Sequence, residues 1–165
     1  MAADPFLALH REHESIRKVL RSLEAALDAA MNRDRATASD LFAIREAAAY
    51  LRTTGEAHLR REERALLAPL EERIGRHGTL VGVIAYDHDE VRRETRKLEE
   101  ALAAVDTAGD ARGAELRELN RHGIFLVQYF SLHMAKEDSA LADLARQILG
   151  EDGLAEVARR LEAPG

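Results

Sequence analysis

One feature limits most strongly how this 165-residue chain can fold. It is a repeat at one fixed offset, which equals the interval from His13 to His88. The reactive members of the repeat form three pairs: His13 and His88, His58 and His133, and Glu62 and Glu137. Their neighbours recur as well, since residues 12–17 read EHESIR and residues 87–92 read DHDEVR. Repeats of this kind mark a structural unit that occurs twice. We therefore predict a duplicated helix hairpin and a site with approximate twofold symmetry.

Apolar residues recur every three or four positions over four long stretches, which is the spacing of amphipathic helices. The first stretch follows the start signal Asp4-Pro5, and the second runs from about 38 to 74, with Gly55 and Pro69 as points of bending. The third begins near residue 81 and the fourth covers about 110–149. Turn-forming residues separate the stretches at 32–34, 75–78 and 107–110.

This pattern predicts an all-α fold, an antiparallel up-down-up-down four-helix bundle over about residues 5–149. A short C-terminal helix is predicted at about 151–162. The length fits one domain spanning residues 1–165.

Composition excludes several classes of function. The net charge is −6 and basic residues alternate with acidic ones, so we expect no nucleic-acid partner. No apolar run approaches the roughly 18 to 20 residues of a membrane span, and no secretory signal is evident, so a cytoplasmic protein is expected, as a monomer or homodimer. The chain has no cysteine, so any metal must be held by nitrogen and oxygen.

The repeated residues have the chemistry of a metal site. In His58-x-x-x-Glu62 and His133-x-x-x-Glu137 both side chains lie on one helix face, roughly 6 Å apart. They face inward among Leu and Ala, where an unpaired carboxylate costs several kcal/mol that a cation would offset. The predicted metal ligands are His13, His58, Glu62, His88, His133 and Glu137.

Two ions fit this ligand set. If each imidazole binds once and each glutamate bridges, the protein supplies fewer donors than the roughly twelve that two octahedral ions need. A shared oxo or hydroxo group would leave about one open position on each ion, where O2, H2O2 or NO can bind. Imidazole and carboxylate together suit iron or manganese, and iron adds redox chemistry.

Other polar residues near the predicted ligands have alternative roles. His10 is either a spare ligand or a proton relay, His77 is expected in solvent, and His122 lines the core or a channel. Tyr129 has three possible roles: a core aromatic residue, a hydrogen-bond donor to a bound oxygen species, or a redox tyrosine. Four acidic residues next to the ligands point about 100° away and are expected in solvent or behind the ligands. They are Glu14, Glu63, Asp89 and Asp138.

From about Phe6 to Leu149 the chain resembles the hemerythrin-like, HHE cation-binding domain family. The resemblance rests on Glu12-His13-Glu14, His58-x-x-x-Glu62, Asp87-His88-Asp89-Glu90 and His133-x-x-x-Glu137. It implies a non-haem di-iron centre with carboxylate and oxo-type bridges, held by the same six residues. Oxygen-carrying members have a further histidine where this chain has Arg92, which argues against reversible O2 transport. Iron–sulfur repair members carry a segment with cysteine, which this chain lacks.

Two functional hypotheses remain open, with a third weighed against them. The first is a di-iron protein that binds O2, H2O2 or NO, with catalase-like or peroxidase-like turnover. The alternative is an oxygen, NO or iron sensing or storage module without turnover. A metal-free structural bundle would have to bury four imidazoles and two carboxylates together without an ion, which disfavours it.

Overall fold

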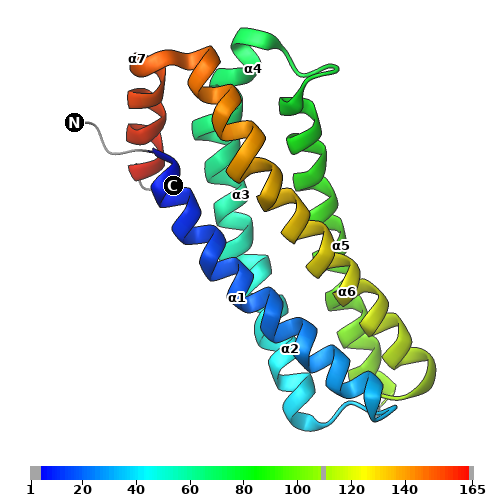
Figure 1. The fold of residues 1–165 in the computed structure, drawn as a ribbon. Helices are drawn as coiled ribbons and strands as arrows, with labels where there is room; N and C mark the ends of the chain where they lie inside the picture. Colours follow the sequence, from blue (N-terminus) through cyan, green and yellow to red (C-terminus); the bar gives the residue numbers. More distant parts are fainter. Residues whose placement is uncertain (1–4, 109–110, 164–165) are drawn as a thin grey trace.

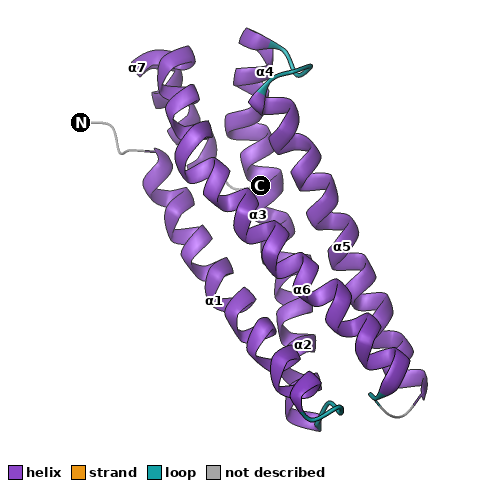
Figure 2. Ribbon diagram, turned by 45° about the vertical axis from the view of Figure 1, so that its right-hand side comes forward, coloured by secondary structure: helices purple, strands orange, loops and turns teal. Residues whose placement is uncertain are grey.

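The computed structural model describes residues 5–108 and 111–163, and in this part of the chain the regular structure is all helical. The predicted N-cap Asp4 and the Gly109-Asp110 end of a predicted turn lie outside the described residues. The elements pack as four antiparallel columns (Figure 1), joined by short loops (Figure 2). The columns are α1 (Pro5–Asn32); α2 (Ala38–Tyr50), α3 (Glu56–Glu62) and α4 (Ala68–Ile74); α5 (Leu80–Ala108); and α6 (Gly113–Lys136) continuing into α7 (Ala142–Glu162). The predicted all-α four-helix bundle is confirmed.

The second and fourth columns are not uniform α-helices, because single π-helical turns interrupt them. These turns span Leu51–Gly55, Glu63–Leu67 and Glu137–Leu141. The first ends at Gly55 and the second precedes Pro69, the two positions where the sequence predicts bending. The second turn directly follows Glu62 and the third begins at Glu137, and π turns inside α-helices often occur at functional sites.

The last helix folds back at a glycine. Inside α7 the backbone of Gly150 combines a positive φ with an extended ψ, a region that is essentially open to glycine only. The helix therefore turns sharply there, and its final segment lies beside the start of α1 (Figure 1). Val157 and Leu161 of this segment are buried in the same apolar cluster as Phe6 and Leu9.

Two apolar clusters fill the bundle, and a polar layer lies between them. On α1, Phe6 and Leu9 belong to one cluster, whereas Ile16 and Leu20 belong to the other. His13 lies between these two pairs in the sequence and is equally buried. Burial of the apolar stripes on either side thus holds the polar layer away from water. No helix among the described residues is both long and apolar enough to cross a membrane.

Candidate metal centre

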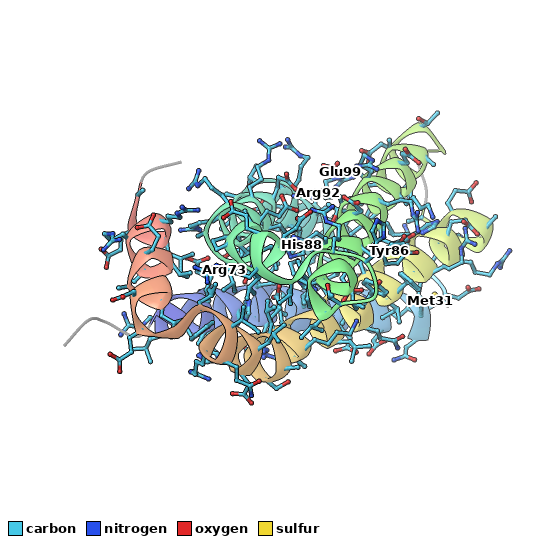
Figure 3. The ribbon with its side chains drawn as sticks, turned by 90° about the horizontal axis from the view of Figure 1, so that it is seen from above. Met31, Arg73, Tyr86, His88, Arg92 and Glu99 are labelled. Atoms are coloured by element: carbon cyan, nitrogen blue, oxygen red, sulfur yellow. The ribbon has the colours of Figure 1, made fainter. Side chains whose placement is uncertain are left out.

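All six predicted ligand residues meet in the polar layer. Each is at most 4% exposed, and they come from all four columns. His88 illustrates the arrangement, since it lies within the ring of helices when the bundle is viewed from above (Figure 3). The residues are His13 on α1, His58 and Glu62 on α3, His88 on α5, His133 on α6, and Glu137 at the π turn that follows.

The ligand atoms fall into two groups of four that share both glutamates. One group contains His13 and His58, the other contains His88 and His133, and in each the ligand atoms lie within 4.8 Å of one another. Glu137 reaches both groups. Its Oε1 is 3.1 Å from Nε2 of His133, and its Oε2 is 3.3 Å from Nε2 of His13.

The tautomers of the histidines are set from outside the cluster. Nδ1 of His13 lies 2.7 Å from a carboxylate oxygen of Asp138, and Nδ1 of His58 lies 2.7 Å from one of Glu12. A carboxylate accepts, so each Nδ1 carries the proton and each Nε2 of a neutral ring presents a lone pair. These two Nε2 atoms are only 3.1 Å apart. A cation between them would turn this repulsion into shared ligation.

The spacing itself matches ligation. Donors bound at about 2.1 Å and separated by roughly 90 to 110° at the ion lie about 3.0 to 3.4 Å apart. The Nε2 atoms of His13 and His58 meet this value, and so do the contacts of Glu137 with His13 and His133.

Several buried atoms of the cluster lack hydrogen-bond partners among the described residues. They include both carboxylate oxygens of Glu62, Oε2 of Glu137 and Nε2 of His133. Unpartnered buried polar atoms are rare in folded proteins, because each one costs its lost hydration. These four atoms belong to residues of the two groups, and their lack of partners is explained if they face cations. The His and Glu groups therefore fit a metal-binding site.

A second layer of carboxylates surrounds the cluster and obeys the same repeat as the ligands. His13 pairs with Asp138 and His88 with Glu63, at 2.7 and 2.9 Å from the respective Nδ1 atoms. The other set is His58 with Glu12 at 2.7 Å and His133 with Asp87 at 3.5 Å. Each carboxylate therefore has its counterpart one repeat away in the sequence. Two of the four pairings join one half of the repeat to the other.

Cations behind these carboxylates repeat as well. Arg17 pairs with Asp138, and Arg92 pairs with Glu63 at 2.8 Å. Arg61 lies 3.1 Å from Glu12, and Lys136 lies 2.6 Å from Asp87. Residues 17 and 92 are one repeat apart, as are residues 61 and 136. The duplicated unit thus contains the ligands, their carboxylate acceptors and the cations that hold those carboxylates.

These cations keep the outer carboxylates ionised. Burial opposes this, but hydrogen bonds to His88 and Arg92 lower the pKa of Glu63 to about 2. In the same way, His133, Lys136 and Tyr129 outweigh burial and lower the pKa of Asp87 to about 2. Burial together with the Asp87 carboxylate raises the pKa of Tyr129. At neutral pH the outer shell therefore consists of acceptors for the Nδ1–H groups.

The remaining candidate residues lie outside the cluster. His10 contacts Asp138 at 3.1 Å, and His122 contacts Glu94 at 2.9 Å. Tyr129 donates to Asp87 at 2.7 Å, whereas His77 is exposed in a turn. Arg92, at the position of the further histidine in oxygen carriers, supports Glu63 and is not part of the cluster.

Sequence reasoning placed Glu63 and Asp138 either in solvent or behind the ligands, and the structure places them behind the ligands. Glu14 and Asp89 are exposed. Glu12 and Asp87 were part of the recognised repeat, but their contacts with His58 and His133 were not anticipated. The signal was present in the repeat, which extends to the acceptors and to their cations. The sequence pattern does not indicate which residue faces which across the bundle.

Comparison with known proteins gives one match. A family model described as the hemerythrin HHE cation binding domain matches residues 4–145. No curated protein matches the chain, and no solved structure does.

We predict that the metal-free chain loses stability as the pH rises above neutral. Burial lowers the pKa of His13 and of His88, but nearby carboxylates outweigh this effect. Glu137 and Glu62 raise the pKa of His13 from 6.5 to about 10, and Glu137 and Glu63 raise that of His88 to about 9. A histidine whose pKa is higher in the folded state contributes its full stability at a pH below the unfolded-state pKa, near 6.5. This contribution to the free energy of unfolding disappears as the pH approaches 9 to 10. Urea denaturation between pH 6 and 10 measures the change.

The metal-loaded chain is the control for this pH experiment. Its ligand imidazoles are neutral, so the same loss should not occur over that range. A metal-free chain equally stable at pH 6 and pH 10 would contradict the account.

A second prediction concerns the outer carboxylates. Glu12→Ala and Asp138→Ala should each weaken metal binding about 10- to 100-fold, because an Nδ1–H group loses its acceptor and the imidazole its fixed orientation. Asp89→Ala is the matched control, since Asp89 is 78% exposed and contacts Arg92 at 3.5 Å rather than a histidine of the cluster. Competition with a chelator of known affinity measures all three. Equal affinities in the three variants would show that the outer carboxylates do not support the ligands.

Proposed function

Since the chain belongs to the hemerythrin HHE cation-binding domain family, we propose that it is a non-haem di-iron protein whose ions bind O2, H2O2 or NO. One observation supports this proposal most strongly. Two groups of buried ligand atoms share Glu62 and Glu137, and each group supplies two imidazoles. The two groups would hold one ion each, with Glu62 and Glu137 available to both.

Iron is proposed because of the donor set and the chemistry it enables. Imidazole nitrogen and carboxylate oxygen suit iron and manganese, while thiolate, which favours zinc and copper(I), is absent from the chain. A bound pair of iron ions would supply the redox change and the open positions for a small oxygen or nitrogen species. The same ligands would also hold manganese, so metal analysis decides between the two.

The space beside the ligand atoms supports a very small partner. A cavity of about 10 Å³ is lined by His13, Glu62 and Glu137, by the polar His10 and Asp138, and by apolar side chains that include Phe6 and Leu9. A cavity of this size holds about one water-sized molecule. O2, NO and H2O2 are of that order, whereas a larger organic substrate would not fit beside the ions.

The protein's own residues would orient the centre and hold its charge. Asp138, Glu12 and Glu63 accept the Nδ1 protons of His13, His58 and His88, which keeps each Nε2 directed inward. The two ligand glutamates and the four outer carboxylates supply negative charge against the ions. Near the surface, the partly exposed His10 contacts Asp138 and offers a place for a proton beside the site.

We predict that His133→Ala and Glu137→Ala each lower the iron content of the chain after anaerobic loading. The wild-type chain should retain about two ions, because both groups of ligands are complete. Each variant should lose at least one, since Glu137 belongs to both groups and His133 provides one of the two imidazoles of its group. His77→Ala is the control and should load like the wild type, because His77 is exposed in a turn. Iron analysis per chain measures the result.

Peroxide then distinguishes turnover from binding. Repeated consumption of H2O2 by the loaded wild type, lost in Glu137→Ala, would support a catalase-like or peroxidase-like enzyme. Stable binding without consumption would instead support the sensing or storage alternative. Equal iron content in all four proteins would contradict the ligand assignment.

A further inference from the structure

One difference between the two halves of the outer shell is an aromatic side chain, Tyr129, that lies against the carboxylate of the second half. The hydroxyl of Tyr129 donates to Asp87 at 2.7 Å, and its ring stacks on Phe125 with 5.5 Å between centroids and 16° between planes. Nζ of Lys136 lies 6.0 Å from the same ring and 2.6 Å from the other oxygen of Asp87. A phenol thus covers the carboxylate that supports His133.

The first half has a threonine in that place, and the pocket residues Arg11 and Ser15 also differ from their counterparts, Tyr86 and Glu90. The corresponding residues, one repeat earlier, are Glu12 for Asp87, Tyr50 for Phe125, Thr54 for Tyr129, His58 for His133 and Arg61 for Lys136. All five of these earlier residues line one pocket of about 310 Å³. The small side chain of Thr54 stands where the other half has a tyrosine, and the pocket opens there.

Exposure of the two carboxylates reflects this difference. The side chain of Glu12 is 29% exposed, whereas that of Asp87 is 3% exposed. Both contact a histidine of the cluster and both pair with a basic residue, but only Asp87 also accepts from a tyrosine hydroxyl. The π turn at Leu51–Gly55 includes Thr54 and directly follows Tyr50, and both residues line the pocket.

The lining determines which molecule would fit. Glu12 accepts from His58, forms an ion pair with Arg61 and, as an ionised carboxylate, has capacity for a further donor. Tyr50 offers an aromatic face and Ile16 an apolar wall. Aromatic rings prefer stacked or edge contacts with one another. The volume is near the lower end of the roughly 300 to 1,000 Å³ typical of ligand pockets.

We propose that this pocket binds a small single-ring phenol or hydroquinone. Its hydroxyl donates to Glu12 and its ring lies against Tyr50, as the hydroxyl and ring of Tyr129 do with Asp87 and Phe125. The ligand contacts the outer side of the centre and is separated from the ions by Glu12 and His58. The site lies beyond the ion pair and does not depend on whether the ions turn over a substrate.

The test uses p-cresol, the side-chain analogue of tyrosine, with the metal-loaded full-length chain under anaerobic conditions. Isothermal titration calorimetry and ligand-observed NMR should show one p-cresol per chain. Toluene, which lacks the hydroxyl donor, should bind at least tenfold more weakly. Thr54→Tyr should weaken p-cresol binding at least tenfold, because the new side chain fills the pocket as Tyr129 fills its counterpart.

Two further variants make the result specific. Thr53→Tyr adds the same side chain to the neighbouring exposed position, which does not line this pocket, and should leave binding unchanged. Tyr129→Thr should open the equivalent pocket and raise the stoichiometry from one to two. Metal content and circular dichroism confirm that each variant is folded and loaded.

Three results would overturn the proposal. They are no p-cresol binding by the wild type, equal affinity for p-cresol and toluene, and unchanged p-cresol binding by a folded, loaded Thr54→Tyr variant. Because binding is read directly, these results are independent of any peroxide or oxygen activity. A chain that fails to consume peroxide but binds p-cresol as described would keep this proposal and lose the enzymatic one.

Discussion

At the centre of the bundle, buried lone pairs of imidazole nitrogens and carboxylate oxygens face one another, and the surrounding structure has to accommodate their repulsion. Nε2 of His13 and Nε2 of His58 face each other at 3.1 Å, and both oxygens of Glu62 have no hydrogen-bond partner among the described residues. Without a cation, this arrangement is stable only if the imidazoles take up protons, as the raised pKa of His13 indicates. Two apolar clusters, one on each side, hold the layer dry. The layer therefore requires positive charge, from protons on the imidazoles or from bound metal ions.

Duplication explains how such a layer is supported. Each ligand histidine has an acidic partner and each acidic partner a cation, and these supports recur at the same offset as the ligands. Glu63 and Asp138 reach ligands of the opposite half of the repeat, so neither half completes its own shell. The symmetry is broken in the aromatic cover, where Thr54 in one half corresponds to Tyr129 in the other. A duplicated structural core can in this way carry two different surfaces.

Much of this could be predicted from the sequence because the signals were periodic. Apolar spacing gave the four columns, and the offset of His13, His58 and Glu62 gave the ligand set that the structure brings together. Three features could not be predicted. The π turns depend on tertiary packing, and the sequence indicated only bends at Gly55 and Pro69. Pairing of Asp138 with His13 depends on the azimuth of two helices distant in sequence. The pocket at Thr54 depends on a side chain that is small in only one half.

Anomalous X-ray diffraction at the iron edge, on crystals of the anaerobically loaded chain, tests the central claim most directly. The account predicts two peaks in the polar layer. One should lie between the Nε2 atoms of His13 and His58 and the other between those of His88 and His133, each within ligand distance of an oxygen of Glu137. A fully loaded chain with a single peak, or with peaks outside the layer, would contradict it.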